Sequence, residues 1–134
     1  MVPRCTTSVA DQVREIYAGL ASRDPARTAR ACHADVLVQV AGDHALSGTY
    51  VGVPAVRALF SRIEALGGQA KFTITGIMAD DDEDEVLVEA CVAHGEHVRT
   101  VVHRLVLRDG RLAELHEHPM DQCTEDAFWR SLLR

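Results

Sequence analysis

The stretch 111-RLAELHEHPMDQCTEDAFW-129 decides the fold, because it joins a strand to a terminal helix and gathers polar side chains where the two meet. Alternate residues of a strand share one face. The residues that this spacing places on one face are Leu112, Glu114, His116 and His118. Pro119 then ends the strand, and a helix is expected from about Thr124. Asp121 lies in the break between the two, so four polar side chains (Glu114, His116, His118 and Asp121) are expected near a cavity or open water.

Three more strands precede this stretch. The first two are expected over Phe72 to Met78 and Glu85 to His94. The third spans Val98 to Leu107, and its alternation places His103 on the same side as apolar neighbours. Short connections, including the turn Arg108-Asp109-Gly110, predict that these strands pair in antiparallel fashion.

The pattern of the N-terminal half predicts mainly helices. Ser8 is expected to cap a first amphipathic helix, and Asp24-Pro25 opens a short second one that runs to about Cys32. A third helix begins near Val53 and stops at Gly67-Gly68. Between the second and third helices, Val36 to Val40 forms a strand and 47-SGTYVG-52 closes a small hairpin.

This order of elements predicts an α+β domain of residues 1–134 in which one curved sheet wraps around helices. The expected shape is a cone with one open mouth and a largely apolar pocket between the sheet and the first three helices. At 134 residues the chain is long enough for one packed core, and no second domain is needed.

Composition limits the partners. The net charge of −6 argues against a nucleic-acid backbone or an anionic membrane surface, because both need clustered Lys and Arg. No window reaches the ~18 apolar residues of a membrane span, and the N-terminus does not resemble a signal peptide. The four cysteines stand far apart without zinc-finger spacing, so reduced thiols, no metal and a cytoplasmic protein are expected. A small apolar ligand fits this composition better.

Three segments of the chain resemble the nuclear transport factor 2-like superfamily, and within it the SnoaL-like branch that includes polyketide cyclases. The segments are 16-IYAGL-20 followed by 23-RDP-25, then 47-SGTYVG-52, and 109-DGRLAE-114 leading to Asp121. Together they extend over most of the chain, from residue 16 to residue 121. They mark a fold more than a chemistry, since the glycines permit the turns.

The resemblance implies a cone-shaped fold with a curved, mostly antiparallel sheet around three N-terminal helices. It also implies an acid/base residue, because SnoaL-like cyclases use an aspartate near the end of the last strand, a place similar to that of Asp121. Ketosteroid isomerases, of the same superfamily, carry their general base on the first strand, where this chain has Gln39. Fold alone does not choose among these chemistries.

The candidate catalytic residues are therefore Asp121 and His103. A carboxyl group in an apolar cavity is held in its acid form and can protonate a carbonyl or epoxide oxygen, with His103 passing the proton in either direction. The candidate substrate-binding residues are Gln39, Glu114, His116, Tyr17 and Tyr50. Plainer alternatives are a helix-cap aspartate, a core histidine hydrogen-bonded to backbone, and tyrosines that belong to the core.

Metal binding by Glu114, His116 and His118 is a weaker alternative, because no further ligand follows at a recognised spacing. The predicted function is a cofactor-free cyclase, isomerase or lyase that acts on a small polyketide- or terpenoid-like molecule and pairs into a homodimer through the outer sheet face. A module that binds such a molecule without changing it, and an accessory domain with a vestigial pocket, remain the rival hypotheses.

Overall fold

Four helices and six strands make up the described part of the chain, which in this computed structural model comprises residues 8–67, 71–80, 82, 84–94 and 97–132. In chain order they are α1 Val9–Ala21, α2 Pro25–Ala31, β1 Cys32–Val40, β2 Gly48–Val51, α3 Val53–Gly67, β3 Lys71–Ala79, β4 Glu85–His94, β5 His97–Arg108, β6 Arg111–Pro119 and α4 Gln122–Leu132. The predicted α+β class is confirmed, with every predicted element present.

The caps of the first two helices are those that the sequence predicts. The Ser8 hydroxyl accepts a hydrogen bond from the Asp11 backbone N–H at 3.2 Å, and the Asp24 carboxylate accepts one from the Ala26 N–H at 3.0 Å. Side chains of this kind satisfy N–H groups that the first turn of a helix leaves without a partner. The two helices begin where these caps stand.

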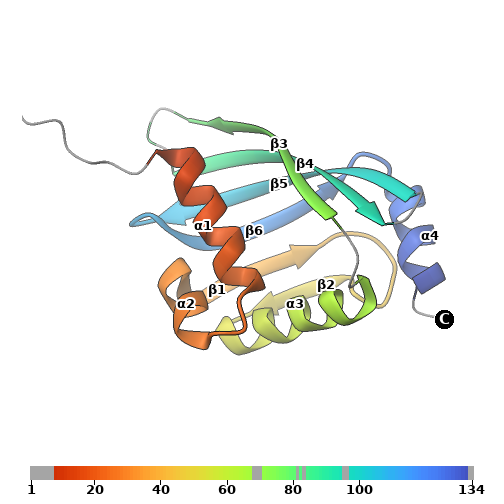
Figure 1. Cartoon of the computed structure of the whole chain (residues 1–134), viewed down its shortest axis with the longest axis horizontal. Coiled ribbons are helices and arrows are strands. Elements are labelled where there is room, and N and C mark those ends of the chain that lie inside the picture. The colour runs from red at the N-terminus through yellow and green to blue at the C-terminus, as the bar shows by residue number, and fades with distance from the viewer. Residues whose placement is uncertain (1–7, 68–70, 81, 83, 95–96, 133–134) are drawn as a thin grey trace, which may run out of the picture.

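The six strands form one curved sheet in the order β2-β1-β6-β5-β4-β3 (Figure 1). All neighbours pair antiparallel except β1 and β6, which run parallel. Helices α1, α2 and α3 cover one face, and α4 lies at the end of the sheet where β6 finishes (Figure 1). We call the covered face the inner face and the opposite one the outer face.

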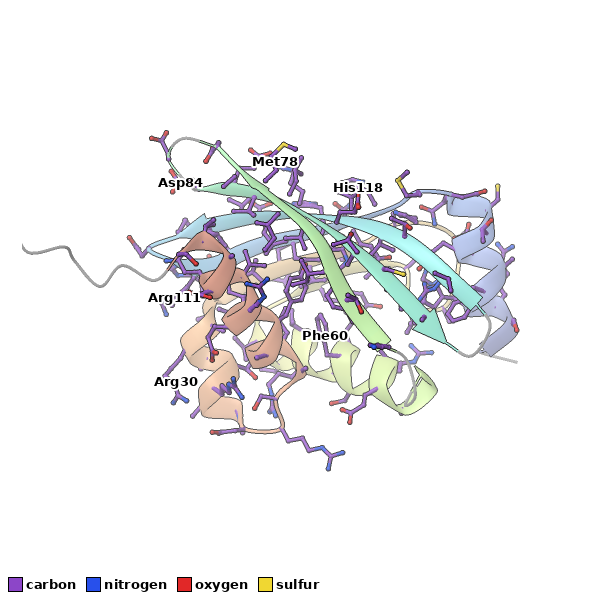
Figure 2. All side chains as sticks on the ribbon, turned by 45° about the horizontal axis from the view of Figure 1, so that its top comes forward. Arg30, Phe60, Met78, Asp84, Arg111 and His118 are labelled. Atoms are coloured by element: carbon purple, nitrogen blue, oxygen red, sulfur yellow. The ribbon has the colours of Figure 1, made fainter. Side chains whose placement is uncertain are left out.

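Side chains separate between these two faces. Phe60 on α3 points toward the sheet, whereas Met78 and His118 lie on the opposite side of it (Figure 2). The inner-face residues that are fully buried include Val38, Val86, Val88, Val101, Leu105 and Leu115, and they pack against Val13, Ile16 and Leu20 of α1 and Val56 and Leu59 of α3. This layer between sheet and helices is the core.

A β-bulge in β6 changes which of its residues face inward. Val106 pairs with Glu114 and Leu107 pairs with Leu112, so Ala113 is an extra residue that has no partner on β5. An extra residue shifts the alternation of a strand by one, which moves every following side chain to the other face.

The prediction that Leu112 and the polar residues after it share one face is therefore wrong. Leu112 faces the core, but beyond the bulge it is Leu115 and Glu117 that face inward, opposite Leu105 and His103 of β5. The side chains of Glu114, His116 and His118 lie on the outer face. Within the described residues no helix is long and apolar enough to cross a membrane.

Candidate functional site

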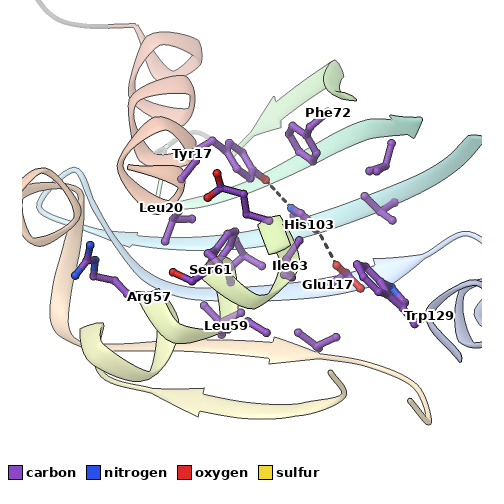
Figure 3. Close-up of a pocket in the computed structure, with 18 of the residues that line it drawn as sticks. Tyr17, Leu20, Arg57, Leu59, Ser61, Ile63, Phe72, His103, Glu117 and Trp129 are labelled. Carbon is purple, nitrogen blue, oxygen red and sulfur yellow. Dashed lines mark hydrogen bonds and ion pairs between the residues drawn. The ribbon is translucent and has the colours of Figure 1, made fainter. Parts of the chain in front are cut away.

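A cavity of about 490 Å³ lies between the inner face of the sheet and helices α1, α3 and α4 (Figure 3). Its volume is within the range of small-molecule sites, about 300–1,000 Å³. The apolar side chains that line it include Leu20, Val38, Val40, Leu59, Phe60, Ile63, Phe72, Val92, Val101 and Leu115. A largely apolar cavity at the inner face was predicted from the sequence, and the structure contains one.

A chain of three polar side chains crosses this apolar wall. The Tyr17 hydroxyl of α1 lies 2.7 Å from Nδ1 of His103 on β5, and Nε2 of the same imidazole lies 3.6 Å from Oε2 of Glu117 on β6 (Figure 3). All three residues line the cavity. The order hydroxyl, imidazole, carboxylate allows a proton to move between the two outer groups through the ring.

The sheet register brings the two charged members together. His103 and Glu117 are directly opposite partners in the antiparallel pair of β5 and β6, and both lie on the inner face. Directly opposite residues have their Cβ atoms about 5 Å apart, within reach of an ion pair. Tyr17 reaches the pair from α1, where it stacks with the His103 ring at a centroid distance of 5.8 Å.

Burial determines the protonation of Tyr17 and leaves two atoms of the other residues without partners. Burial raises the pKa of Tyr17 above its ordinary value, and the nearby Glu117 carboxylate raises that pKa further. The Tyr17 hydroxyl therefore remains a proton donor. Among the described residues, His103 Nε2 and Glu117 Oε1 are buried without a hydrogen-bond partner. Buried polar atoms without partners are uncommon, and a binding or catalytic role is one of the physical reasons for them.

A second polar cluster lies at the α4 end of the cavity. Glu125 is 2% exposed, and its Oε1 accepts hydrogen bonds from Nη1 of Arg99 and, at 2.8 Å, from Nε1 of Trp129. The Arg99 guanidinium carbon lies 4.0 Å from the centre of the Phe128 ring and 5.1 Å from that of Trp129. Phe128 and Trp129 both line the cavity at this end.

Asp121 does not line the cavity, so the expectation that it lies in apolar surroundings is wrong. Its side chain is exposed and accepts a hydrogen bond from the Thr124 backbone N–H at 3.1 Å, which caps α4. That hydrogen bond lowers the pKa of Asp121, whereas a carboxylic acid poised to donate a proton needs a raised one. The plainer alternative from the sequence, that Asp121 is a helix-cap residue, describes its position.

Three predicted substrate-binding residues lie together on the outer face, away from the cavity. Nδ1 of His116 is 2.8 Å from Oε1 of Gln39, and Nε2 of the same ring is 2.9 Å from Oε1 of Glu114. Gln39 pairs with His116 across the parallel β1–β6 ladder, so both share the outer face. The expectation that they face the pocket fails for Glu114 and His116 because the bulge at Ala113 changes the alternation. It fails for Gln39 because this residue alternates along β1 with Val38 and Val40, which are buried on the inner face.

The remaining predicted residues divide between pocket and core. His103 and Tyr17 line the cavity, as described above. Tyr50 lies on β2, its hydroxyl donates a hydrogen bond to the Leu46 carbonyl at 2.7 Å, and it packs against the core outside the cavity lining.

Sequence reasoning missed the charged residues of the cavity, among them Glu117, Arg99 and Glu125. Glu117 stands two residues beyond Leu115, and Leu112-Ala113 is an apolar pair that interrupts the alternation. That pair is the signal of a bulge which would have placed Glu117 inside. Arg99 shares the parity of Val101 and His103, so alternation alone assigns it to the inner face.

No three side chains of His, Cys, Asp or Glu gather as a metal ion would require, as far as the described residues extend. The cluster of Gln39, Glu114 and His116 on the outer face contains one histidine, and both of its ring nitrogens contact side-chain oxygens.

Comparison with known proteins matches residues 13–115 to the SnoaL-like domain. No curated protein matches the chain. Among solved structures, Bal32a from a soil-derived mobile gene cassette aligns with a TM-score of 0.78 and 23% identity, over 91% of this chain and 96% of that one.

Two further structures are similar in fold. TerC, co-crystallised with polyporic acid, aligns with a TM-score of 0.71 and 19% identity over 94% of this chain and 98% of its own. A candidate polyketide cyclase from Sinorhizobium meliloti aligns with a TM-score of 0.65 and 17% identity over 84% and 95% of the two chains. At these identities the likeness is one of fold.

Proposed function

Because the chain belongs to the SnoaL-like domain family, we propose that it is an enzyme without a cofactor that moves protons on a small, largely apolar molecule by general acid–base catalysis. The reaction class is a cyclisation, an isomerisation or an elimination that begins at a carbon beside a carbonyl group. One observation carries the proposal: a hydroxyl, an imidazole and a carboxylate stand in line in an apolar cavity, with one carboxylate oxygen lacking any partner in the described chain.

Glu117 is the general base in this scheme. Its carboxylate takes a proton from the acidic carbon, the C–H electron pair forms a new C=C bond, and the carbonyl π pair moves to oxygen. The Tyr17 hydroxyl, kept protonated by the raised pKa, donates its proton to that oxygen. The resulting enol then closes a ring, is reprotonated at another carbon, or expels a leaving group.

His103 carries protons between Glu117 and Tyr17. In the tautomer that carries its hydrogen on Nδ1, the ring donates to the Tyr17 oxygen at 2.7 Å and resupplies the proton that Tyr17 gives up. Nε2, which lies 3.6 Å from Glu117 Oε2, then receives the proton that Glu117 took from the substrate. Glu117 and Tyr17 return to their starting states, while His103 ends with its hydrogen on Nε2. When the enol is reprotonated at carbon, the same relay runs in reverse through Glu117 and Tyr17 and restores the hydrogen to Nδ1, so no other reactant is needed.

The ligand class rests on the lining and on the neighbours. The cavity wall is mostly hydrocarbon, which favours a small apolar molecule of polyketide or terpenoid type. Two proteins of the same fold point the same way, one a candidate polyketide cyclase and one crystallised with polyporic acid.

The test is deuterium exchange at the acidic carbon of an apolar ketone, 2-tetralone, followed by NMR in D2O. We expect wild type to speed the exchange and Glu117→Gln to lose roughly 10²-fold or more of that rate, the usual contribution of a positioned base. Asp121→Asn is the matched comparison, because it neutralises the carboxylate that the family pattern favours, and it should keep the rate. The reverse pattern would place the base at Asp121 and contradict the proposal.

A binding module is the alternative function, favoured by the size of the apolar cavity alone. A bound ligand stabilises the folded state, so a module would show a raised Tm with 2-tetralone but no exchange in any variant. An accessory domain with a vestigial pocket would show neither effect.

A homodimer through the outer sheet face is part of the proposal. Half-buried Val102 and Val106 lie on that face, and Leu87 beside them is 40% exposed. Together they form an apolar patch of the kind that supports a protein–protein interface. Val102→Arg should convert the dimer to a monomer in light scattering, and a wild-type monomer would refute the proposed dimer.

The free thiols of Cys32, Cys91 and Cys123 support a reducing, cytoplasmic location.

A further inference from the structure

Arg99 belongs to the second polar cluster of the cavity, which is distant from the chain of Tyr17, His103 and Glu117. It lies four residues from His103 on the same face of β5, which separates their Cα atoms by about 13 Å at the rise of a strand. The wall between them is apolar and includes Val101. A ligand that fills this length meets polar groups at both of its ends.

The Arg99 side chain is held in place and yet incompletely satisfied. It is 8% exposed, its Nη1 donates to Glu125, and the rings of Phe128 and Trp129 flank its guanidinium. Its Nε is buried and has no hydrogen-bond partner among the described residues. A buried N–H without a partner is unfavourable, so an acceptor atom of a ligand in the adjoining cavity would stabilise the site.

Charge decides what kind of acceptor fits. Glu125 already neutralises Arg99, and Glu125 itself is 2% exposed. A ligand carboxylate would add an uncompensated negative charge in buried surroundings, which is costly. A neutral oxygen, such as a carbonyl, a phenol or a quinone oxygen, accepts the Nε hydrogen bond without that cost.

We propose that Arg99 is the specificity residue of a subsite for a neutral oxygen, and that the ligand is an elongated apolar molecule with oxygen functions at both ends. The assignment of the other oxygen to Tyr17 rests on the proposed function, whereas the Arg99 subsite does not. The subsite acts in binding and takes no part in proton transfer.

The test compares two ligands, 4,4′-dihydroxybiphenyl and 4-hydroxybiphenyl, which differ by one terminal oxygen. Dissociation constants are measured by fluorescence titration for wild type and for Arg99→Met/Glu125→Gln. The double variant is chosen because Arg99→Met alone leaves Glu125 buried and unpaired, which risks loss of the fold. The glutamine introduced at position 125 still offers an oxygen to Trp129. Arg111→Met, at an exposed arginine outside the cavity, is the control.

Wild type and Arg111→Met should bind the diol at least about tenfold more tightly than the mono-ol, as expected for one added hydrogen bond to a charged group. The folded double variant should bind the two ligands with Kd values within about twofold of each other. An undiminished preference in the double variant, equal binding by wild type, or no binding of either ligand to wild type would each overturn the proposal. The Kd values are measured at equilibrium and without turnover. They can therefore be interpreted even if the protein does not speed deuterium exchange, and the exchange result can be interpreted even if the Arg99 subsite fails its test.

Discussion

Replacing Glu117 by glutamine should stabilise the protein while it slows proton transfer. The carboxylate is 19% exposed, its Oε1 has no partner in the described chain, and its only ionic contact there is the 3.6 Å approach to His103. Leaving a buried acceptor unsatisfied costs about 1–3 kcal/mol, whereas a partly exposed ion pair of this kind returns roughly 0–1 kcal/mol. The carboxylate is therefore a net cost to stability at neutral pH.

The neutral amide is easier to bury, although its NH₂ group also needs a partner. We expect the free energy of unfolding to rise by about 1 kcal/mol, which for a chain of this size raises the Tm by roughly 3–5 °C. Urea denaturation followed by circular dichroism at pH 7 gives the free energy, and a thermal scan gives the Tm.

The matched control is Glu114→Gln, which makes the same chemical change on the same strand but on the outer face, where the Glu114 side chain is 43% exposed. Its effect should stay within about 0.5 kcal/mol of zero, as for most surface substitutions. A Glu117→Gln protein that is less stable than wild type would refute the reasoning, because it would mean that the carboxylate stabilises the fold rather than straining it.

Three further predictions concern titrating groups. The pKa of Tyr17 is raised above 10.0, so the folded state holds that proton more tightly than the unfolded state does. The stability that this proton gives is present below pH 10 and is lost as the pH rises above it. Tyr17→Phe should therefore make the fall in unfolding free energy between pH 9 and 11 shallower. Burial raises the pKa of the Cys32 thiol from 9.0 to about 11, so at pH 8 it should hold about a hundredfold less thiolate than an ordinary thiol. It should therefore react with iodoacetamide more slowly than the exposed Cys123, as read by mass spectrometry of the labelled peptides. Asp121→Ala should lower the Tm at pH 7, and since the pKa of Asp121 is lowered from 3.8, the gap from wild type should close as the pH falls below that value; a gap that stays constant down to pH 2 would exclude the charged cap.

Local chemistry allowed most of the fold to be predicted from sequence. Ser8 and Asp24 start their helices through contacts with N–H groups two or three residues away, and such contacts depend little on the rest of the chain. Alternation placed His103 and its apolar neighbours on the inner face of β5 correctly. The sheet order and the parallel pairing of β1 with β6 depend on segments distant in sequence, so neither was predicted.

The candidate site was predicted in part, and its errors have one cause each. Glu114 and His116 were placed inside because a regular period of two was assumed, and a single extra residue at Ala113 reverses it. Asp121 was placed inside by analogy with a family position, whereas here its carboxylate caps α4 in solvent. Burial of a side chain near a helix start depends on how the helix packs, which a local pattern does not encode.

The bulge at Ala113 gives β6 two alternative sets of functional groups on a single strand. One set, with Glu117, faces the cavity, and the other, with Glu114 and His116, lies on the outer face. A regular strand of the same length, without the bulge, would exchange the two sets at once. Among homologous chains, loss of this bulge is therefore a stronger sign of altered chemistry than most substitutions along the strand.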